Sequence, residues 1–144
     1  MPSISEKLPI WFWIIAGVAL LWNALGVMAF VMQVAMSPEA LAALSEAERA
    51  LHEGFPVWAL AAFATAVFGG TLGSVFLLMR RAVAYPVFIL SLFGIIVQMI
   101  YNFLIAETID VYGPGGTIMP IMILVFGAFL VWFSKSSKQK GWIH

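Results

Sequence analysis

The sequence contains no cysteine among its 144 residues. This absence excludes disulfide bonds, thiol catalysis, zinc sites built on thiolates and iron–sulfur clusters. Charged residues are also scarce, at 10% of the chain, against about 25% in a typical soluble domain. The formal net charge is zero, so no overall field favours nucleic acid as a partner.

Motifs that carry catalytic chemistry are missing as well. The two histidines, His52 and His144, both lie outside the apolar segments, whereas a haem would need a histidine inside one. The sequence has no HExxH motif, no glycine-rich phosphate loop and no recognisable Ser/His/Asp set. We therefore expect a protein that is not an enzyme and that carries neither a metal ion nor another cofactor.

What the chain has in abundance is apolar side chains, which make up 63% of its residues. A bilayer core of about 30 Å needs about 20 apolar residues of helix. Four segments meet this requirement, at approximately 9–34, 55–79, 85–106 and 117–133. The sequence therefore predicts one all-α domain, residues 1–144, folded as an integral membrane four-helix bundle with the lipid bilayer around it.

The basic residues indicate how the chain crosses the membrane. Six of the seven fall on one side of the expected spans: Lys7, Arg80, Arg81, Lys135, Lys138 and Lys140. Only Arg49 lies on the other side, in a loop rich in glutamate. Because short loops rich in Lys and Arg stay in the cytoplasm, we expect both termini to be cytoplasmic, in a cell (inner) membrane. The first span is expected to be a retained helix, because it is too long for a signal peptide.

The loop between the first two spans predicts a helix outside the bilayer. Ser37 can cap a helix, and Ser45 with Glu48 has the spacing of a capping box. A partial apolar stripe is formed by Leu41, Leu44 and Leu51. We expect a short amphipathic helix over approximately 38–53, in the first extracytoplasmic loop. Two roles fit it: lying on the membrane surface, or packing over the ends of the bundle.

Polar side chains within the spans mark the candidate site, because an unpartnered polar group in lipid is costly. At 100° per residue they fall on one face of the first span and one face of the third. The six residues are Trp22, Asn23 and Gln33, and Ser91, Gln98 and Asn102. We expect the two faces to oppose each other, with Asn23 and Gln98 at similar depth near the midplane.

Two interpretations of these polar faces fit the pattern. They could line a pathway for a small neutral polar solute such as a sugar, since amides donate and accept hydrogen bonds and Trp22 could stack on a sugar ring. No carboxylate lies inside a span to bind a coupling ion, which favours a facilitator over an active transporter. Alternatively, the polar groups hold the helices together, and the protein has a structural or accessory role.

Small residues recur at four-residue intervals along the second span and include Gly69, Gly70 and Gly73. Such a pattern lets another helix approach closely. It fits either a tightly packed single bundle or a homodimer. A solute pathway favours the dimer, because four helices are few to enclose one.

Three methionines also recur at four-residue intervals on the first span, at Met28, Met32 and Met36. A ladder of thioethers could pass copper(I), which is a soft cation. These residues lie nearly opposite the polar face of the same helix, and methionine also fills apolar packing without a further role. Both interpretations stay open for this ladder, and packing is the favoured one.

Short motifs spread along the chain resemble those of one family. They are Lys7-Leu-Pro-Ile-Trp11, Trp22-Asn-Ala-Leu-Gly26, Met36-Ser-Pro-Glu-Ala40, Val67-Phe-Gly-Gly-Thr-Leu-Gly73, Ala84-Tyr-Pro-Val-Phe88, Ser91-Leu-Phe-Gly94 with Gln98, and Val111-Tyr-Gly-Pro-Gly115. On these residues the chain resembles, over nearly its whole length, a family of short four-span bacterial membrane proteins labelled uncharacterised or sugar-transporter-like. The resemblance implies a multi-pass inner-membrane protein. The sugar-transporter label of the family is an automatic one that brings no mechanism, and the resemblance implies no particular site residue.

Overall fold

The computed structural model describes residues 8–144, and these residues form helices and turns without a strand. Four helices dominate: α1 (Ile10–Val34), α4 (Val57–Leu78), α5 (Ala84–Ile100) and α7 (Ile118–Gln139). At its end α5 continues through a π-helical turn, η1 (Tyr101–Ile105). All four helices are long and apolar enough to cross a bilayer. The structure therefore confirms an all-helical chain with four candidate spans, as in a multi-pass membrane protein.

Prolines and exposed turns set the starts of these helices. Pro9 and Pro56 hold extended backbone immediately before α1 and α4, a conformation that the φ fixed by the proline ring allows. The turn between α4 and α5 is made by Arg80, whose φ of 59° reverses the chain. The last helix, α7, runs to Gln139, beyond the expected end of the fourth span at residue 133. Ser134 and Ser137, which belong to this additional part of the helix, are buried.

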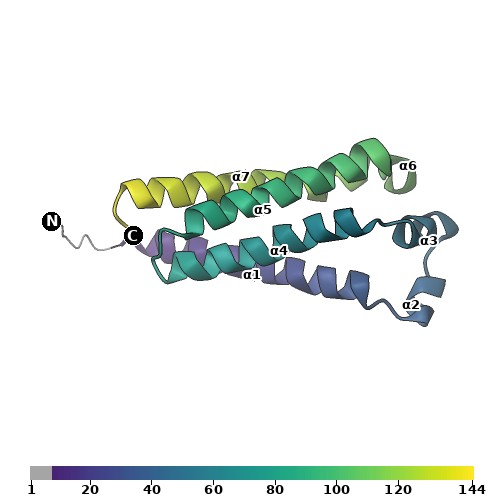
Figure 1. The fold of residues 1–144 in the computed structure, drawn as a ribbon, viewed down its shortest axis with the longest axis horizontal. Coiled ribbons are helices and arrows are strands. Elements are labelled where there is room, and N and C mark those ends of the chain that lie inside the picture. The colour runs from purple at the N-terminus through teal and green to yellow at the C-terminus, as the bar shows by residue number, and fades with distance from the viewer. Residues whose placement is uncertain (1–7) are drawn as a thin grey trace.

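The four helices pack in the order α1, α4, α5, α7, so that α4 contacts α1 and α5, and α5 contacts α7 (Figure 1). Small residues make the contact between α4 and α5 close. A Cβ added at Gly94 of α5 would lie 2.8 Å from the Ala62 carbonyl oxygen and 2.9 Å from the Ala66 backbone nitrogen, both on α4. Backbone therefore meets backbone at this crossing, which only small residues permit.

The end of the bundle that holds residues 142–144 is filled by large side chains, and we call it the terminal end. Phe12, Phe88 and Phe133 are buried there, and the rings of Phe12 and Phe133 lie 5.7 Å apart. Ile143 is also buried. The His144 N–H donates to the Arg80 carbonyl at 3.0 Å, which ties the end of the chain to the turn between α4 and α5.

The opposite end, which we call the α3 end, carries four short elements (Figure 1). They are α2 (Pro38–Ala42), α3 (Glu46–Glu53), α6 (Ile109–Tyr112) and the 3-10 turn η2 (Pro114–Thr117). The loop expected to hold one helix over 38–53 thus holds two, separated by a turn at Ala43–Ser45. Ser45 and Glu48 form the capping box at the start of α3.

Arg49 fixes the turn between α2 and α3. Its guanidinium donates to the carbonyl oxygens of Leu41 at 3.3 Å and Leu44 at 3.1 Å. Five of the six basic residues expected on the side opposite Arg49 lie at the terminal end (Figure 1). Arg80 and Arg81 follow α4, Lys135 and Lys138 lie in the last part of α7, and Lys140 follows α7. The sixth, Lys7, lies outside the described residues.

Candidate functional site

A cavity of about 360 Å³ lies within the bundle, lined by residues of all four long helices. We call it the central cavity. Most of its lining is apolar and includes Trp22, Phe63, Phe126 and Leu130. Three polar residues interrupt this surface: Asn23, Ser91 and Gln98. A largely apolar pocket with a few convergent polar groups has the composition of a small-molecule site.

Ser91 is buried, and its hydroxyl joins two helices. The Ser91 Oγ donates to the Ala66 carbonyl on α4 at 2.6 Å. Gly69 lies beneath this bond, because a Cβ added there would lie 3.2 Å from the Ser91 Cβ. Ser91 therefore holds α5 against α4, and its donor is already engaged.

Asn23 is half-buried on α1 and faces Gly70 of α4. Its Nδ2 donates to the Ala19 carbonyl of its own helix at 2.9 Å. Its amide oxygen occupies the space that a side chain at position 70 would fill. This oxygen accepts no hydrogen bond from residues 8–144, so it is free to accept one from a molecule in the cavity.

Gln98 supplies the free amide of the central cavity. Its side chain is half-buried on α5 and makes no hydrogen bond with another residue of the described chain. A side-chain amide has two donor hydrogens and an acceptor oxygen. Gln98 can therefore both donate to and accept from a neutral hydroxyl group.

The two polar faces meet through α4 and not directly. We expected the faces of α1 and α5 to oppose each other, but Asn23 lies against Gly70 and Ser91 bonds to Ala66. Because α4 carries small residues, both of its neighbours can approach it closely, and it lies between α1 and α5. Asn23 and Gln98 still line the same cavity.

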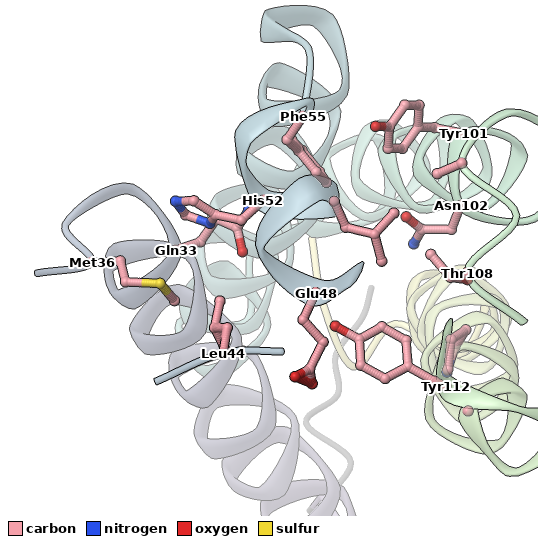
Figure 2. A pocket seen from close by; sticks show the side chains of 14 residues that line it. Gln33, Met36, Leu44, Glu48, His52, Phe55, Tyr101, Asn102, Thr108 and Tyr112 are labelled. Carbon is pink, nitrogen blue, oxygen red and sulfur yellow. The ribbon is translucent and has the colours of Figure 1, made fainter. Parts of the chain in front are cut away.

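Gln33 and Asn102 belong to a second cavity, of about 280 Å³, beneath α3. Figure 2 shows this α3 cavity, with Asn102 and Thr108 pointing into it from one side and Gln33 on the other. Asn102 lies four residues, or about one helical turn, beyond Gln98, which places it nearer the α3 end. It lies in the π-helical turn η1, in which the Ala106 N–H donates to the Tyr101 carbonyl at 2.8 Å.

The α3 cavity also contains polar residues that sequence periodicity did not select: Glu48, His52, Thr108 and Tyr112. They come from loops and short helices, where no regular spacing groups them. The Tyr112 hydroxyl points toward the Glu48 side chain (Figure 2). Partial burial, and next the charge of Glu48, raise the pKa of Tyr112 above its ordinary value. Both causes of this raised pKa are consistent with a polar cavity that is partly shielded from water.

The methionine ladder does not line the central cavity. Met28 and Met32 are 55% and 64% exposed on the outer surface of α1, and Met36 lines the α3 cavity instead. Within residues 8–144, no group of three His, Cys, Asp or Glu side chains could hold a metal ion. The described part of the chain thus contains no continuous row of thioethers through the bundle.

Trp22 lines the central cavity and packs against Phe126 of α7, with ring centroids 5.2 Å apart. The cavity therefore combines aromatic surface, a free amide and a free amide oxygen, and it holds no charged side chain. Comparison of the sequence and structure with family models, curated proteins and solved structures finds no match. A function for this chain therefore has to be inferred from the chemistry of its cavities.

Proposed function

We propose that this membrane protein binds a small neutral solute in the central cavity and facilitates its movement across the bilayer. The observation that carries the proposal is the free amide of Gln98 in an otherwise apolar cavity within the membrane-spanning part of the bundle. A polar group is costly at this depth unless something binds it. A solute hydroxyl would satisfy both Gln98 and the amide oxygen of Asn23.

The lining also indicates the class of solute. It has no charge, which favours a neutral molecule, and its polar groups are amides, which suit hydroxyls. The apolar remainder, including the ring of Trp22, would contact a hydrocarbon face. A sugar has both features, since its ring carries hydroxyls at the edge and C–H bonds on the face. The α3 cavity, with Gln33 and Asn102, would be the vestibule of this pathway.

We further propose that the terminal end faces the cytoplasm of a bacterial inner membrane, because Lys and Arg are concentrated there. Cysteines placed at Glu39 and Lys138 test this orientation in whole cells with a membrane-impermeant maleimide. Labelling of Glu39→Cys in intact cells, and of Lys138→Cys only after lysis, is expected. The reverse pattern would place the termini outside.

Counterflow of labelled sugars in proteoliposomes tests the proposed transport. We expect saturable uptake above that of empty liposomes, and a large loss in Gln98→Met, which keeps the side-chain volume but removes the amide. Thr71→Val is the matched control, because Thr71 bonds its hydroxyl to its own helix at 2.7 Å and does not line the cavity. Uptake equal to that of empty liposomes, or unchanged in Gln98→Met, would contradict the proposal.

A structural or accessory role is the second candidate, and the Ser91 hydroxyl favours it. This donor is engaged within the bundle at 2.6 Å, as expected of a polar group that holds helices together. Under this alternative Gln98 would also contribute to stability, and a partner protein or a second copy of the chain would cover the exposed apolar helices. The free energies of unfolding of Ser91 and Gln98 variants separate the two roles.

A further inference from the structure

The α3 cavity contains a carboxylate, which the central cavity lacks. Glu48 is half-buried and lines it together with three aromatic rings, those of Phe55, Tyr101 and Tyr112. One oxygen of Glu48 accepts the Ser45 N–H at 3.2 Å in the capping box. The carboxylate keeps further acceptor capacity, since an ionised carboxylate can accept about four hydrogen bonds.

Within residues 8–144, no lysine or arginine side chain pairs with this carboxylate, and the imidazole of His52 lines the same cavity. Arg49 is next to it in sequence, but its guanidinium is held by the carbonyl oxygens of Leu41 and Leu44 and does not line the cavity. The α3 end as a whole has six carboxylates against this one guanidinium, a formal charge of −5 with His52 counted as neutral: Glu39, Glu46, Glu48, Glu53, Glu107 and Asp110. Such a field raises the local concentration of cations.

The remaining lining is suited to an organic cation. Amide oxygens of Gln33 and Asn102 and the hydroxyl of Thr108 can accept N–H groups. Aromatic rings attract a cation that lies over their faces, and the ring of Tyr101 is itself fixed by Phe55 at 5.1 Å. A multiply charged metal ion would need more carboxylate or imidazole ligands than the described residues bring together.

We infer that the α3 cavity binds a small organic cation with a single ammonium group, either an amine or a quaternary ammonium, with its charge beside Glu48 and its alkyl groups against the aromatic rings. This site is distinct from the central cavity and does not rest on the proposed movement of a neutral solute. It gives the α3 end a binding activity of its own, at the mouth of the bundle.

Calorimetric titration of the full chain in lipid nanodiscs tests this inference. The probes are tetramethylammonium and butylammonium chloride, with tert-butanol as an uncharged analogue and empty nanodiscs as the blank. We expect saturable binding of at least one of the two cations and none of tert-butanol. Glu48→Gln should weaken cation binding about tenfold, as expected for the loss of a charged hydrogen-bond partner.

The choice of variants keeps the result interpretable. Glutamine serves as well as glutamate in a capping box, so α3 should keep its fold in Glu48→Gln. Glu53→Gln is the matched control, because it makes the same change of charge on the exposed side of the same helix. Tyr112→Ala, at a side chain that is more than half exposed, should weaken binding about two- to fivefold through the lost ring.

Four results would overturn the inference. They are no saturable binding of either cation, binding of tert-butanol as tight as that of the cations, weakening in Glu53→Gln as large as in Glu48→Gln, and displacement of the organic cation by an equal concentration of sodium chloride. The last two would mean that diffuse surface charge or an inorganic cation site accounts for the signal. Sugar counterflow in the unaltered protein distinguishes this site from the proposed transport function. Failure of cation binding with counterflow intact would remove only the cation site.

Discussion

Glycine at position 94 shows how single residues set the distance between helices. Its Cα faces backbone atoms of α4 and not the flexible end of a side chain. Backbone atoms cannot relieve a close contact by changing rotamer, as a side chain can, so a methyl group at position 94 would force α4 and α5 apart. Because Ser91 bonds to α4 one turn away, this separation would also weaken that hydrogen bond.

We therefore expect Gly94→Ala to lower the free energy of unfolding by about 1–3 kcal/mol, the usual cost of overpacking. Gly17→Ala is the matched control, because nothing lies within 4 Å of a Cβ added there. That change should be neutral or stabilising by about 0.5–1 kcal/mol. Unfolding in mixed micelles with increasing sodium dodecyl sulfate, followed by circular dichroism, measures both. Equal stability of the two variants would mean that the α4–α5 crossing is looser than the contacts of Gly94 indicate.

Ser91 and Gln98 differ in what their polar groups contact, and this difference separates the two proposed roles. Ser91→Ala removes a buried interhelical hydrogen bond, so we expect a loss of about 0.6–2 kcal/mol of unfolding free energy. Gln98→Met removes an amide that has no partner in the described chain and is costly within the membrane, so we expect no loss of unfolding free energy. The same micelle titration measures both variants. A loss in Gln98→Met as large as that in Ser91→Ala would favour the accessory role.

At the scale of elements, hydropathy was sufficient to predict four spans, because a segment of about 20 apolar residues has few alternatives to a membrane helix. It did not predict η1, since a π-helical turn leaves no mark on composition. Asn102 was placed in line with Gln98, and hydropathy did not show that one turn further along the helix it belongs to the other cavity. Nor did it predict the contact of residues 142–144 with Arg80, which depends on two distant segments meeting at one end.

The candidate site was predicted as a set of residues and not as a shape. All six polar residues chosen by helical periodicity line a cavity, but they divide between two. Helical periodicity predicts which residues share one face of a helix, but it does not predict which neighbouring helix that face contacts. The position of α4 between α1 and α5 follows from close contacts such as those of Gly70 and Gly94, which need three-dimensional information.

The proximity of α3 and α6 leads to a prediction about Tyr112. Its raised pKa results from partial burial and from the charge of Glu48, so replacing Glu48 by glutamine should lower the pKa toward the ordinary value of 10.0. Ionisation of the phenol, followed by ultraviolet absorbance in a Tyr85→Phe, Tyr101→Phe background, measures this. Glu53→Gln should have the smaller effect. An unchanged pKa in Glu48→Gln would mean that α3 and α6 lie further apart.

The sign of the accompanying effect on stability follows from the same pKa. A pKa raised in the folded state means that the folded protein holds the phenol proton more tightly than the unfolded chain does. The stabilisation from Tyr112 is therefore fully present below pH 10 and is lost as the pH rises through the folded-state pKa. Near neutral pH the Tyr112 phenol is protonated in both the folded and the unfolded chain, so this residue should not make the free energy of unfolding depend on pH there.

At the scale of the whole molecule, the two ends of the bundle differ. The terminal end is filled by Phe12, Phe133 and Ile143, whereas the α3 end and the middle hold the two cavities. Leu25 of α1 and Met119 of α7 line the central cavity and are 52% and 55% exposed, so the cavity opens at the surface between these helices. Under the proposed function a solute would enter through this opening or from the proposed vestibule in the α3 cavity, and its passage to the terminal end would require the aromatic residues there to move.

The proposed function requires that water-soluble molecules reach the cavity around Gln98, although it lies within the membrane-spanning bundle. The natural absence of cysteine makes a direct measurement simple: the rate at which a hydrophilic methanethiosulfonate reagent modifies Gln98→Cys in proteoliposomes. Leu21→Cys, on the exposed apolar surface of α1, is the control. We predict that Gln98→Cys is modified rapidly and Leu21→Cys is not. Equal rates, or no modification of Gln98→Cys, would contradict the proposed access to the cavity.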